Sequence, residues 1–128
     1  MAKNLIVAII DDDDSIRAAT SRLVRSLGWQ AQTFTRAQDF LDANEATPVT
    51  CIISDIQMPV MSGLEMLRIL NTRGSDVPVI FITAFCTDAI RREALRAGAV
   101  AFLCKPVVGA EIQGCLEGVL AGSLSRRP

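Results

Sequence analysis

Five short apolar segments alternate with five stretches of helical periodicity, and this alternation limits the folds open to the chain. The apolar segments span residues 5–10, 30–34, 51–54, 77–82 and 100–103. Apolar residues three or four positions apart predict helices near 14–27, 36–43, 63–72, 87–97 and 109–121. Because most of the predicted strands are almost continuously apolar, we expect a doubly wound α/β fold, with a parallel sheet of strand order 2-1-3-4-5 between two helical layers.

Charge and histidine content exclude several classes of function. Thirteen basic and fourteen acidic residues leave a net charge of −1, so the 128-residue chain has no overall attraction to nucleic acid or anionic lipid. The sequence has no histidine, which removes the commonest catalytic base and metal ligand. The apolar segment 5–10 is too short for a signal peptide or a membrane span. We therefore expect a cytoplasmic protein that binds neither nucleic acid nor membrane through this chain.

The cysteine spacing gives no sign of a paired site. Cys51, Cys86, Cys104 and Cys115 are separated by 35, 18 and 11 residues, which matches no paired metal-binding or redox motif. We expect four buried free thiols, as is usual for a protein kept in a reducing compartment.

Polar side chains follow four of the predicted strands where each strand ends. Asp11 and Asp12 follow the first, Asp55 the third and Thr83 the fourth, while Lys105 comes shortly after the fifth. The carboxyl ends of parallel strands meet at one edge of a sheet, and that edge carries the ligand site in open α/β folds. The sequence therefore predicts that these side chains converge on one small volume.

The chemistry of this set indicates a divalent cation. Neighbouring carboxylates repel one another by about 4 kcal/mol at a separation of about 4 Å and an effective dielectric near 20. Lys105 supplies one compensating charge, and Mg²⁺ or Mn²⁺ is a cation that prefers carboxylate oxygens. The following Asp13 and Asp14 have a simpler role, because aspartates at a helix start cap free N–H groups.

Four motifs, IIDDDDSIR, SDIQMPVMSGLEML, VIFITA and AFLCKP, carry a family resemblance. The sequence resembles the receiver domain of bacterial two-component response regulators, in the style of the FixJ/NarL-type transcriptional regulators, over residues about 4–121. The resemblance implies a CheY-like, flavodoxin-like (βα)5 fold. It divides the chain into a receiver domain at 1–121 and a C-terminal tail or linker start at 122–128.

The same resemblance implies roles for the polar residues. Asp11, Asp12, Asp55 and the backbone carbonyl of Gln57 match the family's Mg²⁺ ligands. Asp55 matches the residue that accepts a phosphoryl group from a sensor histidine kinase, and Lys105 matches the lysine that pairs with the phosphoryl oxygens. The resemblance implies that the chain is not an enzyme, apart from phosphorylation and dephosphorylation of its own Asp55.

A conformational switch is also implied. Thr83 matches the family's switch hydroxyl and Phe102 its switch aromatic residue. Phosphorylation would then change the surface formed by the predicted helix 87–97, strand 100–103 and helix 109–121, where Arg91, Arg92 and Arg96 offer charges. Such a surface serves homodimerisation or contact with an output domain outside this chain.

Other functions compete with this interpretation. In a haloacid-dehalogenase-like Mg²⁺ phosphohydrolase, Asp11 would be the nucleophile and would form a DxDx[ST] motif with Asp13 and Ser15. That reading leaves Asp55 without a role. In a flavodoxin-like FMN binder, the four aspartates after the first strand would repel the ligand's phosphate. A degenerate receiver acting only as a binding module would not need Asp55, Thr83 and Lys105 together.

Overall fold

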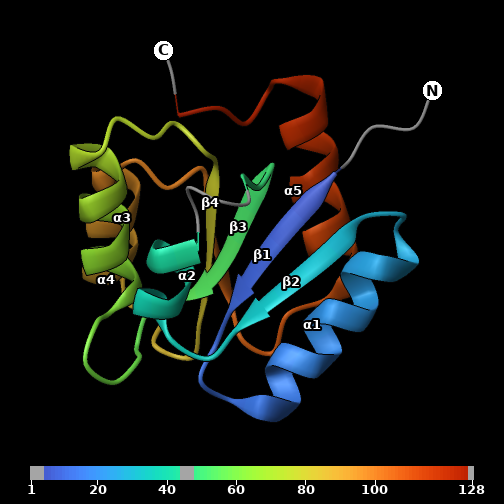
Figure 1. The fold of residues 1–128 in the computed structure, drawn as a ribbon, viewed down its shortest axis with the longest axis horizontal. Coiled ribbons are helices and arrows are strands. Elements are labelled where there is room, and N and C mark those ends of the chain that lie inside the picture. The colour runs from blue at the N-terminus through green and yellow to red at the C-terminus, as the bar shows by residue number, and fades with distance from the viewer. Residues whose placement is uncertain (1–4, 44–47, 127–128) are drawn as a thin grey trace.

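The computed structural model describes residues 5–43 and 48–126 (Figure 1). Strands and helices alternate along the chain: β1 (Ile6–Ile10), α1 (Asp14–Ser26), β2 (Gln30–Phe34), α2 (Ala37–Ala43), β3 (Cys51–Asp55), α3 (Gly63–Thr72), β4 (Val79–Thr83), α4 (Asp88–Ala97), β5 (Ala101–Cys104) and α5 (Gly109–Ala121). The helices begin and end within one residue of their predicted bounds. The largest difference is at β4, which starts after Pro78 because proline has no N–H to donate to a ladder.

The strands form one parallel sheet in the order β2-β1-β3-β4-β5, as predicted. β1 lies between β2 and β3, so the strand order reverses beside it. Ile10 is in register with Ser54, which places the residues after β1 next to Asp55 at the end of β3. The predicted α/β fold with a doubly wound sheet is therefore confirmed, and its switch point lies between β1 and β3.

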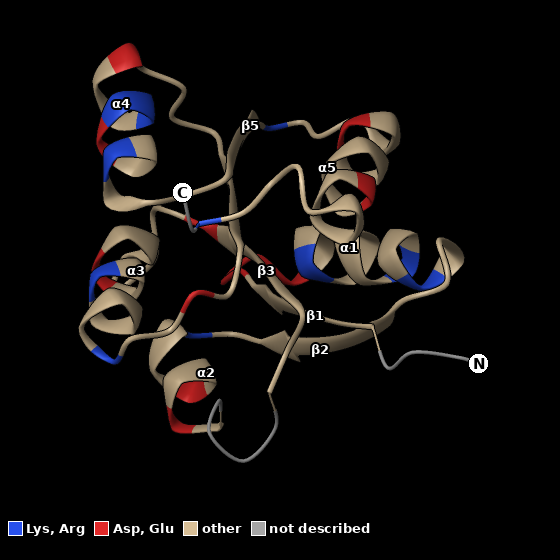
Figure 2. Ribbon diagram, turned by 90° about the horizontal axis from the view of Figure 1, so that it is seen from above, with Lys and Arg blue, Asp and Glu red and all other residues tan. Residues whose placement is uncertain are grey.

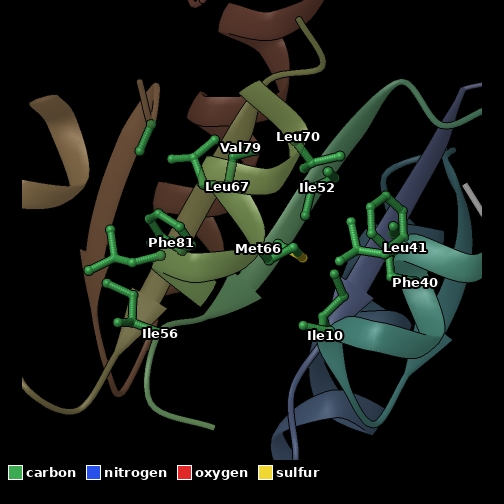
Figure 3. Close-up of a cluster of buried hydrophobic side chains, with 14 of the residues drawn as sticks. Ile10, Phe40, Leu41, Ile52, Ile56, Met66, Leu67, Leu70, Val79 and Phe81 are labelled. Atoms are coloured by element: carbon green, nitrogen blue, oxygen red, sulfur yellow. The ribbon is translucent and has the colours of Figure 1, made fainter. Parts of the chain in front are cut away.

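Two hydrophobic cores cover the two faces of the sheet. Ile52 and Phe81 point toward α2, α3 and α4, where they pack with Met66 in the first core (Figure 3). Ile53 and Ile80 point the other way, toward α1 and α5. Successive residues of a strand face opposite sides, which explains why strands covered on both sides are apolar throughout. Figure 1 shows the two helical layers on either side of the strands.

The start of α3 packs directly on the backbone of Asp55. Ser62 caps this helix: its hydroxyl accepts a hydrogen bond from the Glu65 amide at 3.1 Å, and Glu65 accepts one from the Ser62 amide at 3.0 Å. Gly63 follows, and a Cβ at that position would lie against the carbonyl oxygen of Asp55 and 2.8 Å from the Phe81 ring. Glycine is therefore required here by close approach, although its backbone conformation is helical.

The residues after α5 fold back onto the domain. Gly122 ends the helix with a positive φ of 78°, and the Leu124 amide donates to the carbonyl of Gly118 at 3.1 Å. The Arg126 guanidinium donates to the carbonyl of Val77 at 3.0 Å, just before β4. The predicted bounds 1–121 and 122–128 also include residues 1–4 and 127–128, which lie outside the described residues. Within the described ranges, no helix has the length and apolar character needed to cross a membrane.

Candidate functional site

Three carboxylates meet at the carboxyl edge of the sheet, between β1 and β3. Carboxylate oxygens of Asp11, Asp12 and Asp55 all lie within 4.8 Å of one another. Asp11 is 1% exposed and Asp55 6%, whereas Asp12 is exposed. Figure 2 shows acidic residues gathered beside β3, between the two helical layers. The structure thus brings together the three residues that the sequence predicted as metal ligands.

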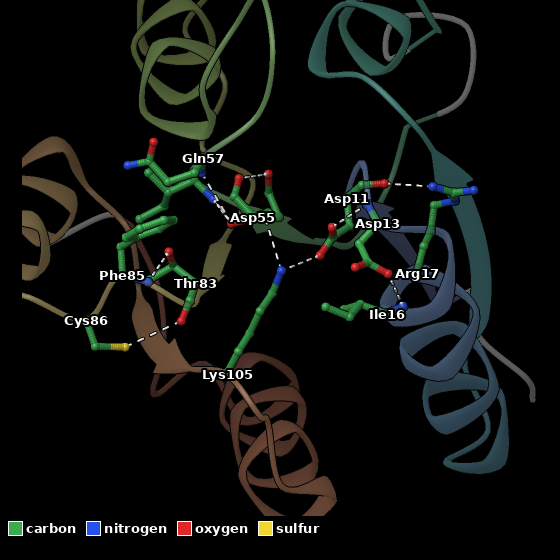
Figure 4. Close-up of polar contacts among 12 residues, drawn as sticks. Asp11, Asp13, Ile16, Arg17, Asp55, Gln57, Thr83, Phe85, Cys86 and Lys105 are labelled. Carbon is green, nitrogen blue, oxygen red and sulfur yellow. Dashed lines mark hydrogen bonds and ion pairs between the residues drawn. The ribbon is translucent and has the colours of Figure 1, made fainter.

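Lys105 places its ammonium between the two buried carboxylates (Figure 4). Its Nζ lies 3.0 Å from Oδ2 of Asp55 and 3.1 Å from Oδ2 of Asp11. The Lys105 amide donates to the carbonyl of Thr83 at 2.8 Å, so the residue after β5 is tied to the end of β4. Burial lowers the pKa of Lys105, but the hydrogen bonds and charges of Asp55 and Asp11 outweigh this effect and raise the pKa overall.

The two oxygens of Asp55 have different surroundings. Oδ1 accepts hydrogen bonds from the amides of Ile56 at 2.7 Å and Gln57 at 3.2 Å. Oδ2 accepts a hydrogen bond from the Lys105 ammonium at 3.0 Å. Because both oxygens are held, the carboxylate has one fixed orientation at the end of β3. The Gln57 carbonyl, predicted as a metal ligand, belongs to the same short turn, and its role there stays a prediction.

Asp11 has one oxygen that is buried and incompletely satisfied. Oδ1 accepts a hydrogen bond from the Asp13 amide at 2.9 Å. Oδ2 is paired ionically with Lys105 but, among the described residues, accepts no hydrogen bond of good geometry. Burial raises the pKa of Asp11, although the Asp13 amide and the Lys105 ammonium both act to lower it. A buried carboxylate oxygen with free acceptor capacity is suited to a further positive partner.

The donor set fits a hard divalent cation. All three side chains offer oxygen, and Oδ2 of Asp11 has acceptor capacity left. Mg²⁺ and Mn²⁺ are bound by few carboxylates together with water and phosphate oxygens, which suits a site with one exposed edge at Asp12. The residues present are therefore compatible with the predicted Mg²⁺.

Replacing Asp11 by asparagine is expected to raise the free energy of unfolding by about 1 kcal/mol at neutral pH, which is a Tm increase of roughly 4 °C. Asparagine has no charge at this position, whereas the buried Asp11 carboxyl has a raised pKa in the folded state because burial disfavours its charged form. In the wild type, the unfolded chain loses this proton at its ordinary pKa of 3.8, before the folded chain does, so stability falls as pH rises through the folded pKa. The difference in free energy of unfolding between Asp11→Asn and the wild type is therefore complete at neutral pH and disappears below pH 3.8.

Thermal unfolding with a chelator present, at several pH values, measures this effect. Asp12→Asn is the matched control, because Asp12 is exposed and its replacement is expected to change the free energy of unfolding by less than about 0.5 kcal/mol. An Asp11→Asn protein no more stable than the wild type at pH 7 would show that ionised Asp11 is not destabilising.

Asp13 and Asp14 serve the helix rather than the carboxylate cluster, as predicted. Asp13 is the N-cap of α1, and its side chain accepts a hydrogen bond from the Ile16 amide at 3.0 Å. Asp14 lies in the first turn and pairs with Arg17. The Arg17 guanidinium, which no sequence motif singled out, also donates to the carbonyl of Asp11 at 2.8 Å. Its position one helical turn after Asp13 and Asp14 could have indicated a contact with these aspartates.

The two predicted switch residues face the same side of the sheet. Phe81 is in register with Phe102, and Thr83 with Cys104, so Thr83 and Phe102 lie two positions apart on one face. Thr83 is buried, and its hydroxyl oxygen accepts a hydrogen bond from the Phe85 amide at 3.0 Å. Phe102 is half-buried and packs against the first core. The hydroxyl of Thr83 is thus engaged by the loop that follows β4.

The prediction of four buried free thiols was wrong for two of them. Cys86 and Cys104 form a disulfide, with their Cα atoms 5.8 Å apart, and both residues are exposed. Their separation of 18 residues hides the contact, because β4 and β5 are adjacent strands and the chain between them runs through α4. Cys51 is a buried free thiol, as expected, and burial raises its pKa to about 12. Cys115 is free and half-buried.

A match to a known family identifies the chain as a receiver domain. Residues 7–117 match the model of the response regulator receiver domain. The chain belongs to this family. The resemblance seen in the motifs is confirmed, and a receiver domain is not a conventional enzyme. The haloacid-dehalogenase-like alternative receives no support.

Similar proteins include several transcriptional regulators. The receiver domain is 38% identical to the transcriptional regulatory protein FixJ of Azorhizobium caulinodans over 123 residues, which covers 96% of this chain and 58% of that protein. It is 36% identical to the response regulator protein TodT of Pseudomonas putida over 115 residues, which covers 90% of this chain and 51% of that protein. The chain therefore spans about half the length of the curated relatives it matches.

Solved structures agree with this assignment. The crystal structure of FixJ-N matches the receiver domain with a TM-score of 0.85 and 29% identity, and the match covers 92% of this chain and 94% of that one. The chemotaxis protein CheY4 of Vibrio cholerae matches with a TM-score of 0.85 and 25% identity, covering 91% and 99%. The CheY-like, flavodoxin-like (βα)5 fold predicted for the receiver domain is confirmed.

Proposed function

We propose that this receiver domain accepts a phosphoryl group on Asp55 from a sensor histidine kinase and uses the modified Asp55 to change its α4-β5-α5 surface. The position of Asp55 carries the proposal: its carboxylate is buried at the end of β3, fixed by two amides and 3.0 Å from the Lys105 ammonium. The chain contains no histidine, so the imidazole that donates the phosphoryl group belongs to the kinase.

In this proposal Asp11, Asp12, Asp55 and the Gln57 carbonyl hold Mg²⁺, or Mn²⁺ in its place. The ion, when bound, neutralises negative charge on the phosphoryl oxygens. The chain's own groups do the rest. The Ile56 and Gln57 amides orient Asp55 for attack, and Lys105 offers an ammonium to a phosphoryl oxygen. Phosphoryl transfer depends mainly on such positioning and charge neutralisation.

The response to phosphorylation is assigned to Thr83 and Phe102. Phosphorylated Asp55 carries up to about two negative charges and new acceptor oxygens. The Thr83 hydroxyl oxygen now accepts a hydrogen bond from the Phe85 amide. When the side chain turns toward Asp55, the oxygen leaves this amide and the hydroxyl donates its proton to a phosphoryl oxygen. Phe102 then moves into the space near Thr83, and the surface that carries Arg91 and Arg92 is altered. That surface would mediate homodimerisation or contact with an output domain outside this chain.

Incubation of the chain with acetyl phosphate and Mg²⁺ tests the proposal. We expect one acid-stable, base-labile phosphoryl group per chain, located on Asp55 by mass spectrometry after borohydride reduction. Asp55→Asn should lose the signal to background level, whereas Asp39→Asn, an exposed aspartate on α2, should keep it. Phosphate on Asp11, together with sustained hydrolysis of phosphate esters, would instead indicate the phosphohydrolase.

A further inference from the structure

The Cys86–Cys104 disulfide joins two segments that flank the proposed phosphorylation site. Cys86 lies in the loop 84–87 between β4 and α4, three residues after Thr83. Cys104 ends β5, is in register with Thr83, and precedes Lys105. Figure 4 shows Cys86 beside Thr83, where its Sγ lies 3.4 Å from the Thr83 carbonyl oxygen. The bond therefore lies next to both the switch hydroxyl and the lysine of the site.

We propose that Cys86 and Cys104 are a reversible thiol–disulfide site that controls the response of this receiver domain. As a disulfide, the pair fixes the loop 84–87 in the arrangement described here and opposes phosphorylation of Asp55. As two thiols, it releases the loop. This inference rests on the proposed function, since it concerns the regulation of the same site.

The hydrogen bonds of the loop explain the direction of the effect. The Thr83 hydroxyl accepts from the amide of Phe85, the residue directly before Cys86. Turning this hydroxyl toward Asp55 requires the Phe85 amide to give up its acceptor and the loop to move. The disulfide holds the other side of Phe85 to β5, and the Lys105 amide holds β5 to the Thr83 carbonyl at 2.8 Å. The disulfide thus restrains Thr83 in two ways, through the loop that follows it and through the adjacent strand β5.

The cross-link also encloses the segment that would respond. The chain between Cys86 and Cys104 contains all of α4 (Asp88–Ala97) and most of β5, including Phe102. Both ends of this segment are joined when the disulfide is present. The disulfide therefore limits the movement of α4 relative to β5 at this edge. If the phosphorylated state requires this movement, the disulfide disfavours that state relative to the unphosphorylated one.

The exposure of the two cysteines supports reversibility. Cys86 and Cys104 are both exposed, whereas Cys51 is buried and Cys115 half-buried. Thiol–disulfide exchange requires access to sulfur, so the exposed pair can react with a small disulfide such as oxidised glutathione. One cysteine thiolate attacks glutathione disulfide and releases one glutathione thiolate. The second cysteine thiolate attacks the mixed disulfide and releases the other, so two protein thiols are oxidised as one glutathione disulfide is reduced.

The test compares the full chain equilibrated with reduced or with oxidised glutathione. Alkylation and peptide mass spectrometry should find a Cys86–Cys104 cross-link in the oxidised sample, with Cys115 alkylated in both. Each sample, freed of glutathione, then receives acetyl phosphate and Mg²⁺. We expect the steady-state ratio of phosphorylated to unphosphorylated Asp55 to be lower by about fivefold or more in the oxidised chain.

Variants separate the disulfide from other effects of oxidation. Cys86→Ser and Cys104→Ser should each be phosphorylated equally after both treatments, at the level of the reduced wild type. Cys115→Ser is the matched control and should keep the full redox effect. Asp55→Asn should form the same cross-link, because oxidation does not depend on phosphorylation.

The outcomes distinguish this inference from the proposed function. If the reduced wild type is phosphorylated on Asp55, the proposed function stands whatever the redox result. Equal phosphorylation of the reduced and oxidised wild type, or absence of the cross-link, would then overturn the inference alone. If the reduced wild type is not phosphorylated, the proposed function fails and the inference falls with it.

Discussion

Replacing Lys105 by methionine is expected to lower the free energy of unfolding by about 3 kcal/mol at neutral pH in the presence of a chelator. Methionine keeps the apolar part of the side chain but removes the ammonium that lies 3.1 Å from Asp11 and 3.0 Å from Asp55. These carboxylates are 1% and 6% exposed, so water cannot replace the lost charge. Urea denaturation followed by circular dichroism measures the change.

The pH dependence provides an internal check on this prediction. Because the pKa of Lys105 is raised in the folded state, its stabilising contribution is complete below the unfolded value of 10.5. The contribution is lost as pH rises through the folded pKa, so the wild type and Lys105→Met should converge in stability at strongly alkaline pH.

A double-mutant cycle identifies the cause of the loss. In an Asp11→Asn background, Lys105→Met leaves only one buried carboxylate without its partner, so the loss should be smaller by about 1 kcal/mol or more. An equal loss in both backgrounds would mean that the charge of Asp11 contributes nothing to the effect of Lys105, which would then act through Asp55 alone. The same Lys105→Met protein should also incorporate less phosphate from acetyl phosphate, because the ammonium beside Asp55 is missing.

The second large effect is expected from Gly63→Ala, which should lower the free energy of unfolding by about 2 kcal/mol. Helix propensity alone predicts the opposite, since alanine is favoured over glycine inside a helix by about 1 kcal/mol. The added Cβ would lie against the Asp55 carbonyl oxygen, 2.8 Å from Phe81 and 3.2 Å from the Cα of Ile56. Two of these three atoms belong to the backbone, so the helix or the end of β3 has to shift.

That shift should also reach the proposed chemistry. Because the added Cβ presses on the backbone of Asp55 itself, we expect phosphate incorporation to fall by about tenfold or more. Gly114→Ala is the matched control: Gly114 lies within α5, no atom lies within 4 Å of an added Cβ, and the variant should be more stable by about 1 kcal/mol. If Gly63→Ala were as stable and as readily phosphorylated as the wild type, the contact with Asp55 would not constrain the site.

The sequence was most informative where local patterns set the structure. Apolar periodicity located each helix to within one residue, and the continuously apolar strands predicted a sheet covered on both faces. The carboxylate cluster could be predicted because Asp11 and Asp12 follow β1 and Asp55 ends the adjacent strand β3, so strand order alone brings them together. Capping by Asp13 followed from its position at the start of α1.

Features that depend on packing between distant segments could not be predicted. The Cys86–Cys104 contact requires the loop after β4 to bend toward the end of β5, and sequence spacing carries no such information. The close approach of Gly63 to Asp55 depends on the angle at which α3 meets the sheet. The unequal burial of Asp11 and Asp12 arises in the loop between β1 and α1, whose path apolar periodicity does not specify.

The hydrogen bond from Arg126 connects the C-terminal tail to β4, the strand that ends at Thr83. The guanidinium binds the carbonyl of Val77, just before the strand, while Thr83 closes the other end. β4 itself consists of five buried residues, Val79–Thr83, a span of roughly 16 Å at the rise of a parallel strand. A displacement of β4 along its own axis would therefore be transmitted to the C-terminal tail through the hydrogen bond between Arg126 and Val77.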